Sequence, residues 1–389
     1  MPRRTKTTRR RSPTPRGRRT RTTPPLRIAV VGLGYIAQNA VLPAFAHARA
    51  GCRLTALVSG NETKRRVLSK RYRVADTWSY DEYDDALRSD TFDAVYIALP
   101  NHLHRDYAVA AAEAGKHVLC EKPMALTTED CDAMIAAARD RDVRLMIGYR
   151  LHLDPANLYA VDLIRSGKLG QVHAFESVFA TPVEEGNIRV RPEKGGGTLW
   201  DIGIYCINAC RYLFRAEPEE VFAWATNVKG QKFDDVEGTT SALLRFADGR
   251  QGVFWSSFAS ADVASYTVIG SKGRVRIDNA YEYSIPAEAA LTRNDKTTKK
   301  KFAKHDQFAA ELEYFADCVR RGAEPEPSGL EGRTDVAIIR ALYQSAKSGK
   351  PVRVKEEGPS RRPMPDMAIA KPPVSREPAL VGVKPPHAG

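Results

Sequence analysis

Leu26-Arg-Ile-Ala-Val-Val-Gly-Leu-Gly-Tyr-Ile-Ala37 is the stretch that decides the fold of the first part of the chain. Its first six residues are mostly β-branched or apolar, which predicts a buried strand, and a Gly-x-Gly-x-x-Ala turn follows directly. Gly32 permits a tight turn, and Gly34 lets the main chain approach a pyrophosphate. Ala37 allows the next helix to pack closely, with its N-terminal amides facing that pyrophosphate. The stretch predicts a dinucleotide site, with an ordinary glycine-rich turn as the alternative.

The second predicted strand, Leu54–Val58, indicates which dinucleotide is bound. Sites for NAD usually carry Asp or Glu at the end of this strand, where it bonds the ribose 2′-hydroxyl. This chain has Ser59-Gly60-Asn61 there instead, with Lys64 shortly after. A small hydroxyl and a nearby cation suit a 2′-phosphate, so we expect NADP, with NAD as the less favoured cofactor. The alternative is that the cations on the following helix are only a solvated face.

Two domains are expected from the order of the elements. Strands and helices alternate over residues 26–149, which predicts an α/β Rossmann domain with a parallel, doubly wound sheet. Over residues 150–354 the strands follow one another with turns between them, which predicts an α+β domain with a large, mostly antiparallel open sheet. We expect the last helix, about 334–348, to be able to pack back on the Rossmann domain.

Both ends of the chain differ in composition from the middle. Residues 1–24 contain ten Lys or Arg and no acid, which accounts for ten of the net +13 charges. The segment 1–25 is therefore predicted to be a disordered basic arm, able to touch nucleic acid without specificity. The equally favoured alternative is a solvated tail or a misassigned start codon. The segment 355–389 is rich in proline and is predicted to be a flexible, disordered tail.

The cysteines and the hydropathy pattern bear on the cell compartment. The chain has six cysteines and no Cys-x-x-Cys pair, so they are interpreted as buried thiols, with neither a disulfide framework nor a metal site. No apolar run approaches the ~20 residues of a membrane helix. Arg3-Arg4 is not followed by an apolar segment, which argues against export. We therefore expect a cytoplasmic protein with no membrane partner.

Candidate catalytic residues follow the predicted strands. Leu99-Pro-Asn101-His-Leu-His104 comes directly after one strand, and Glu121-Lys122-Pro123 comes after the next. The carboxyl ends of parallel strands meet at one edge of the sheet, so both segments would lie at the nicotinamide end of the cleft. Asp201 and Tyr205 are four residues apart on a predicted helix and share one face.

These residue types suit the oxidation of an alcohol. A base must take the hydroxyl proton as the hydride leaves the carbon. A nearby ammonium such as Lys122 favours the phenolate form of Tyr205, and Asp201 could accept hydrogen bonds from sugar hydroxyls. Each residue also has an ordinary structural interpretation: a core tyrosine, a helix cap and a surface lysine.

The motifs as a set resemble one known family. Four segments are similar to motifs of the glucose–fructose oxidoreductase, inositol dehydrogenase and rhizopine-catabolism family. They are Gly32-Leu-Gly-Tyr-Ile-Ala37, Leu99-Pro-Asn-His-Leu-His104, Ala114-Gly-Lys-His-Val-Leu-Cys-Glu-Lys-Pro123 and Gly195-Gly-Gly-Thr-Leu-Trp-Asp-Ile-Gly-Ile-Tyr205. The resemblance covers about residues 27–354. Because position 205 is a tyrosine, the last motif resembles that of the glucose–fructose oxidoreductase and NADP-dependent aldose dehydrogenase branch.

The resemblance implies a role for each candidate residue. It implies Lys122, Asp201 and Tyr205 as catalytic residues, and Arg150 and His152 as further groups lining the substrate site. The residues expected to bind the cofactor are Gly32, Gly34, Tyr35, Ile36, Ser59, Gly60, Asn61, Lys64, Leu99, Asn101, His104, Glu121 and Arg150. It also implies a homodimer or homotetramer formed through the open sheet.

Three functions follow as expectations. The leading one is transfer of hydride from C1 of a glucose- or xylose-like aldose to NADP, giving a lactone. The second is a glucose–fructose oxidoreductase with tightly bound NADP; the hydrophilic arm, which offers no obvious cover for the adenine, argues against permanent retention. The third is a non-catalytic NADP-binding regulator, which the presence of Lys122, Asp201 and Tyr205 disfavours.

Overall fold

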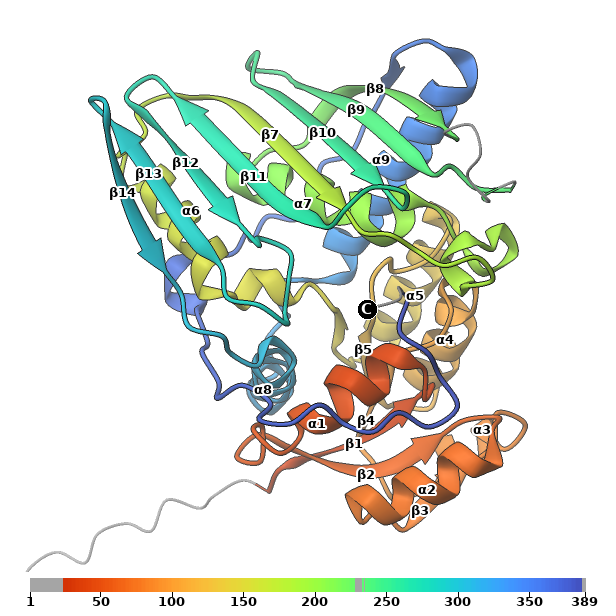
Figure 1. The fold of residues 1–389 in the computed structure, drawn as a ribbon. Coiled ribbons are helices and arrows are strands. Elements are labelled where there is room, and N and C mark those ends of the chain that lie inside the picture. Colours follow the sequence, from red (N-terminus) through yellow and green to blue (C-terminus); the bar gives the residue numbers. More distant parts are fainter. Residues whose placement is uncertain (1–23, 228–232, 234, 387–389) are drawn as a thin grey trace, which may run out of the picture.

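The computed structural model describes residues 24–227, 233 and 235–386 of the 389-residue chain. Nearly all of the basic arm, predicted as residues 1–25, lies outside the described residues. Two sheets dominate the described part, the first low and the second high in the view of Figure 1.

The first sheet is parallel throughout, as the alternating pattern predicts. Its strand order is β3-β2-β1-β4-β5-β6, so the chain moves outward from β1 in both directions. The strands are β1 (Leu26–Val31), β2 (Cys52–Val58), β3 (Asp76–Trp78), β4 (Ala94–Ile97), β5 (His117–Cys120) and β6 (Leu145–Ile147). The change of direction between β1 and β4 places a crevice at their carboxyl ends, where ligands of such sheets bind.

The helices of this domain cover both faces of the sheet. They are a π-helical turn η1 (Ala37–Val41) continued by α1 (Leu42–Ala44), then α2 (Glu62–Tyr72), α3 (Tyr83–Arg88), α4 (His104–Glu113) and α5 (Thr128–Asp140). The Thr127 hydroxyl caps α5 by accepting from the Asp130 amide. A later helix, α8 (Gln307–Arg321), packs Phe308, Leu312 and Phe315 into the core formed by β1 and β2.

Within the described residues, the second sheet has nine strands in the order β14-β13-β12-β11-β7-β10-β9-β8-β15. Only the neighbours β7 and β10 run parallel. The strands are β7 (Val172–Ala180), β8 (Pro218–Thr226), β9 (Thr239–Phe246), β10 (Gln251–Ser257), β11 (Val263–Gly270), β12 (Gly273–Asp278), β13 (Glu288–Arg293), β14 (Lys296–Lys301) and β15 (Val352–Arg353). The predicted large, mostly antiparallel open sheet is confirmed.

Helices cover one face of this second sheet (Figure 1). They are α6 (Pro155–Arg165), α7 (Ile204–Phe214), which continues a π-helical turn η6 (Leu199–Gly203), and α9 (Gly329–Ser348). Helix α9 packs against β8 of this sheet and also against α5 and β6 of the first domain. The two domains therefore share a core along α9.

The C-terminal segment corrects the expectation of a disordered tail over 355–389. Up to residue 386 the structure places it against the body, where the Ile369 amide bonds the Leu153 carbonyl and the Arg71 guanidinium bonds the Ala379 carbonyl. The proline-rich composition gives no sign of this packing, because the partners of the segment are main-chain groups and side chains far away in the sequence. We call residues 377–386 the C-terminal strap.

All six cysteines are buried free thiols, as their spacing predicts. Among the residues that the structure describes, no helix is long and apolar enough to cross a membrane.

Candidate active site

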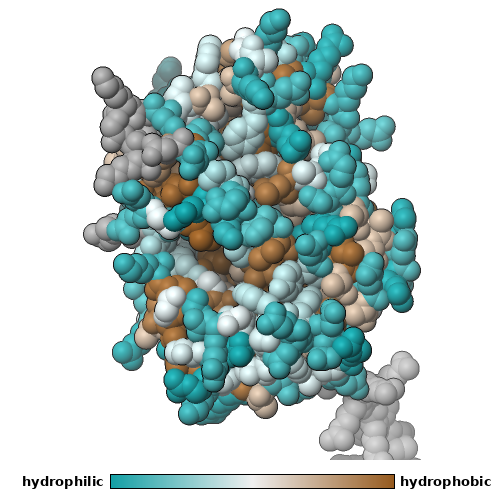
Figure 2. Space-filling model, turned by 90° about the vertical axis from the view of Figure 1, so that its right-hand side faces the viewer, coloured by the Kyte–Doolittle hydropathy of each residue, from teal (hydrophilic) through white to brown (hydrophobic). Residues whose placement is uncertain are grey.

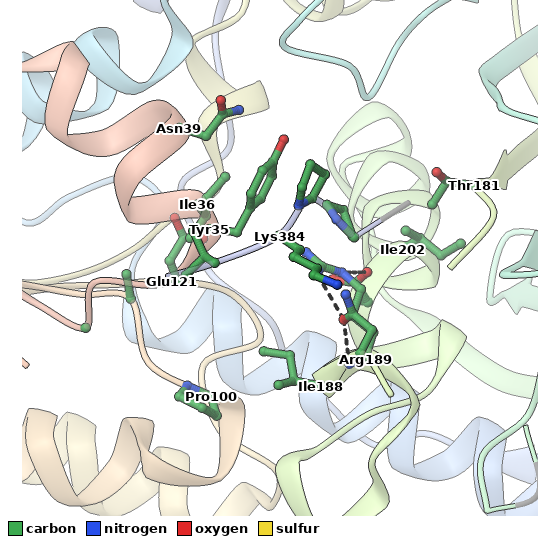
Figure 3. A pocket seen from close by; sticks show the side chains of 18 of the residues that line it. Tyr35, Ile36, Asn39, Pro100, Glu121, Thr181, Ile188, Arg189, Ile202 and Lys384 are labelled. Carbon is green, nitrogen blue, oxygen red and sulfur yellow. Dashed lines mark hydrogen bonds and ion pairs between the residues drawn. The ribbon is translucent and has the colours of Figure 1, made fainter. Parts of the chain in front are cut away.

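A cleft of about 1150 Å³ lies between the carboxyl ends of the parallel strands and the second domain. Figure 2 shows a hollow at mid-height on the face that it views, with apolar surface at its depth. In Figure 3, Tyr35 and Glu121 represent the first-domain wall, and Ile202 and Arg189 represent the second-domain wall. The cleft therefore receives groups from both domains.

The glycine turn is shaped to hold a dinucleotide. Gly32 has a φ of +95°, and a Cβ there would lie 2.4 Å from the Ala98 carbonyl oxygen. A Cβ at Gly34 would meet no protein atom within 4 Å, so this glycine faces open space in the cleft. Exposed main chain at the start of a helix is what a pyrophosphate requires. These residues fit the dinucleotide that the sequence predicts.

Ser59 directly follows β2 and Lys64 lies in the first turn of α2, and both line the cleft. The Arg65 guanidinium bonds the Ser59 carbonyl, which fixes the turn. Burial lowers the pKa of the Lys64 ammonium below its usual range. Glu62, the nearest acid on the following helix, is exposed and does not line the cleft. This end of the cleft therefore offers a hydroxyl and a cation to a ribose substituent.

Lys122 and Asp201 meet across the two domains. The Lys122 ammonium donates to the Asp201 main-chain carbonyl at 2.7 Å and lies 3.6 Å from its carboxylate. The Arg189 guanidinium binds the other carboxylate oxygen at 2.7 Å. Burial opposes the charge of Asp201, but Arg189 and Lys122 outweigh burial and hold the pKa of this carboxyl below its usual value. Asp201 is therefore a carboxylate at neutral pH.

Tyr205 lies next to the same pair. The Lys122 ammonium is 4.6 Å from the centre of the Tyr205 ring, and an Arg150 amino group is 3.3 Å from the phenol oxygen. Arg150 is itself held by the Gln307 side chain and the Tyr281 carbonyl. Two cations therefore contact one phenol, Lys122 over its ring and Arg150 at its oxygen.

Glu121 lines the cleft beside Lys122, on the side of the first domain. It accepts a 2.7 Å hydrogen bond from the Tyr96 hydroxyl. Burial raises the pKa of Glu121, and it raises that of the buried Glu311 carboxyl on α8 much further. Glu121, beside Lys122, and Glu311 are therefore buried carboxyl groups that resist ionisation.

Most of the residues predicted from the sequence come together in this cleft. Those that line it are Gly32, Gly34, Tyr35, Ile36, Ser59, Lys64, Leu99, Asn101, Glu121, Lys122, Arg150, Asp201 and Tyr205.

Four predicted residues lie outside the cleft lining. Gly60 packs against Tyr80, and the Asn61 side chain caps α2. The His104 ring is fully buried and bonds the Leu99 and Pro123 carbonyls, so it ties together the two segments that follow β4 and β5. These three residues shape the cleft from behind.

His152 is the fourth, and it is a buried structural side chain in this fold. Its ring lies 2.7 Å from both the Glu326 carboxylate and the Asn208 amide oxygen, with no exposed surface. The hydrogen bonds to Glu326 and Asn208 raise its pKa despite the opposing effect of burial, which is the largest single influence. Proximity to Arg150 in sequence does not bring His152 into the cleft, because it points the other way from a short 3-10 turn, Arg150–Leu153.

Arg189 and Tyr283 are site residues that the sequence analysis missed. Arg189 lies in a short 3-10 turn, Ile188–Val190, between β7 and η6, where no periodic pattern marks it. Tyr283 lines the cleft and accepts a hydrogen bond from Asn39 of η1, which joins the two walls. The signal that could have found Arg189 is its place on a loop just before Gly195–Gly197, since loops carry many binding residues.

Two family models match the chain. The Oxidoreductase family, NAD-binding Rossmann fold, matches residues 26–149, and the GFO/IDH/MocA C-terminal domain matches residues 158–276.

Individual relatives cover almost the whole described chain. D-xylose 1-dehydrogenase [NADP(+)] from Haloarcula marismortui is 33% identical over 343 residues, which is 86% of this chain and 95% of that protein. The crystal structure of aldose-aldose oxidoreductase from Caulobacter crescentus is similar with a TM-score of 0.81 at 35% identity, covering 85% of this chain and all of that one. A 3-ketoreductase from Actinomadura kijaniata, in complex with NADP and TDP-benzene, has a TM-score of 0.76 at 28% identity, covering 82% and 98%. These similarities support an oxidoreductase that uses NADP.

Proposed function

Because the chain belongs to the GFO/IDH/MocA family of oxidoreductases, we propose that it oxidises an aldose at C1 with NADP and releases a lactone. The observation that carries the proposal is the cluster of Lys122, Asp201 and Tyr205 at the carboxyl ends of the parallel strands. A cyclic aldose is rich in hydroxyls, which suits a carboxylate held between two cations.

Different residues of the chain carry out different parts of this reaction. When bound, the nicotinamide accepts a hydride from the sugar carbon. Tyr205 takes the proton of the C1 hydroxyl, and the positive charges of Lys122 and Arg150 stabilise the phenolate that does so. Asp201 accepts hydrogen bonds from neighbouring sugar hydroxyls and so orients the ring. Arg189 keeps Asp201 charged and in place.

The preference for NADP over NAD rests on the ribose end of the cleft. A carboxylate at the end of β2 would bond the 2′-hydroxyl of NAD and repel a 2′-phosphate. Ser59 offers no such charge, and Lys64 can pair with the phosphate. The D-xylose 1-dehydrogenase relative carries NADP(+) in its name, which supports the same choice.

A substrate panel tests this function. We expect glucose- and xylose-like aldoses to reduce NADP, read by absorbance of the reduced cofactor, and NAD to be used less well. The matched control is the methyl glycoside of each active sugar, which has the same ring but no free C1 hydroxyl. Equal oxidation of the methyl glycoside would assign the reaction to another carbon.

A second candidate is transfer of hydride from one sugar to another through NADP that stays bound. The observation in its favour is the C-terminal strap, which lines the cleft beside the glycine turn. Stoichiometric NADP in the purified protein, and turnover of two sugars without added cofactor, would place this function first. A protein that purifies without cofactor and requires added NADP favours the dehydrogenase.

We also propose that the chain forms a homodimer or homotetramer through the open face of the second sheet. Its exposed apolar side chains include Trp224, Leu243 and Val253, with exposed fractions of 60%, 43% and 39%. Exposed apolar residues grouped on one face are typical of an interface. Light scattering gives the mass in solution, and a monomer would contradict this proposal.

The buried free thiols support a reducing, cytoplasmic location.

A further inference from the structure

The C-terminal strap crosses the cleft from one wall to the other. At Val381 it bonds Gln38 on η1, directly after the glycine turn. At Pro386 its carbonyl accepts from the Glu184 amide, on the segment after β7 of the second domain. Figure 1 shows the dark-blue end of the chain passing α1 and ending between the two domains. The strap is therefore attached on both sides of the site.

Gln38 is the attachment on the first-domain side, and it is fully buried. Its amide nitrogen donates to the Leu33 carbonyl at 2.9 Å and to the Val381 carbonyl at 3.0 Å. Its amide oxygen accepts from the Val381 amide at 2.7 Å. Two of these three hydrogen bonds need the strap, and a buried amide without partners is costly. The helix that follows the glycine turn therefore holds a buried side chain whose hydrogen bonds the strap completes.

The strap lies over the end of the cleft where the phosphates of a dinucleotide belong. Gly382 adopts a φ of +60° beside Lys64, and a Cβ there would lie 3.4 Å from the lysine Cε. Leu380, Val383 and Lys384 of the strap line the same cleft as Gly34. In the view of Figure 3, Lys384 lies between Tyr35 and Arg189. The strap thus brings an additional cation to a place that already suits anions.

We propose that the C-terminal strap is a cofactor clasp: Gln38 holds it, Lys384 binds a phosphate of the dinucleotide, and the cofactor leaves only when the strap opens. The strap lines the cleft with two charged residues, the acid Glu377 at its start and Lys384 near its end. Lys384 comes after the attachment at Val381 and lies between Tyr35 and Arg189 in the view of Figure 3. A cation at this place favours a clasp, which pairs with a phosphate, over a plug that imitates one. The proposal rests on dinucleotide binding and not on which sugar is oxidised.

The test is the rate at which bound NADPH leaves the protein, followed by its fluorescence while an excess of NADP replaces it. Three variants are compared with the full chain: a protein that ends at Arg376, Lys384→Glu, and the control Lys347→Glu, which makes the same charge change on an exposed lysine of α9. No sugar is present, so failure of the proposed substrate does not affect the result. Repeating the series with NADH covers the case in which the cofactor preference is reversed.

We expect release to be at least roughly tenfold faster from the shortened protein, because both attachments are lost. Lys384→Glu should also speed release by about tenfold, since a charge-assisted contact becomes a repulsion. The control should match the full chain. High salt should speed release from the full chain more than from Lys384→Glu, because it screens the contact that this variant lacks.

Two results would overturn the clasp. One is release from the shortened protein and from Lys384→Glu at the rate of the full chain. The other is tighter binding after shortening, which would make the strap a competitor of the cofactor. If the shortened protein does not fold, Lys384→Glu against Lys347→Glu still decides, because both keep the strap and its attachments.

Discussion

The two walls of the cleft present different chemical groups to its interior. The first-domain wall presents main chain at Gly32 and Gly34, where a side chain is either blocked by protein or would fill the space of the ligand. The second-domain wall presents charged and phenolic side chains, Arg189, Asp201 and Tyr205. The first wall therefore offers the shape of its main chain, whereas the side chains that we propose for the chemistry meet only when the two domains pack together.

Lys122 belongs to the first domain but contacts the second, so it should separate chemistry from cofactor binding. We expect Lys122→Ala to lower kcat by about 10²–10⁴-fold, because both the charge beside Tyr205 and the bond to Asp201 are lost. The affinity for NADPH, measured by titration, should change little. Lys168→Ala, at an exposed position after α6, is the control. Near-normal turnover of Lys122→Ala would remove this lysine from the mechanism.

The two glycines of the turn should fail in different ways. Gly32→Ala forces a Cβ onto the Ala98 carbonyl at a positive φ, so it should destabilise the fold by about 1–3 kcal/mol. Gly34→Ala meets no protein atom and should keep stability within about 0.5 kcal/mol while weakening NADPH binding. Thermal unfolding and cofactor titration of both variants check this. Equal losses of stability would show that the turn is not divided in this way.

Ser59→Asp changes the specificity of the first wall without touching the second. The new carboxylate would repel a 2′-phosphate and accept the 2′-hydroxyl of NAD. We expect the ratio of kcat/KM for NADP to that for NAD to fall by about tenfold or more, which corresponds to roughly 1.4 kcal/mol. Ser59→Thr keeps a hydroxyl and serves as the control. An unchanged ratio in Ser59→Asp would mean that another group selects the cofactor.

His152 lies behind both walls and should affect stability more than chemistry. Its pKa is raised in the folded protein, so its ion pair with Glu326 stabilises fully below the unfolded value of about 6.5 and is lost as the pH rises through the folded value. The difference in Tm between the protein and His152→Gln should therefore be largest near pH 6 and shrink toward pH 9. The corresponding difference in the free energy of unfolding is on the order of 1 kcal/mol. A kcat that falls as far as in Lys122→Ala would place His152 in the chemistry.

The parts of the molecule that sequence alone could predict are those with a local pattern. The strand before Gly32, the cap of α5 at Thr127 and the i, i+4 pair Asp201 and Tyr205 each show their role within a few residues. This holds even though Asp201 lies in a π-helical turn, since both side chains still reach the cleft.

The parts that were missed depend on partners distant in the chain. Strand β14 is Lys296-Thr-Thr-Lys-Lys-Lys301, with no apolar residue, because it is an exposed edge strand. Its hairpin turn, Asn294-Asp295 with positive φ at both residues, was the readable signal. Arg189 contacts Asp201, and the C-terminal strap contacts Gln38. No periodic pattern in the sequence connects either of them to its partner.

The most direct test of the account follows one hydrogen atom. Glucose and xylose carrying deuterium at C1 are incubated with the protein and NADP, and the reduced cofactor is weighed by mass spectrometry. We predict that the deuterium moves to the nicotinamide from the C1-labelled sugars and not from the same sugars labelled at C2. Reduced cofactor without deuterium from C1, or no reduction by any aldose of the panel, would contradict it.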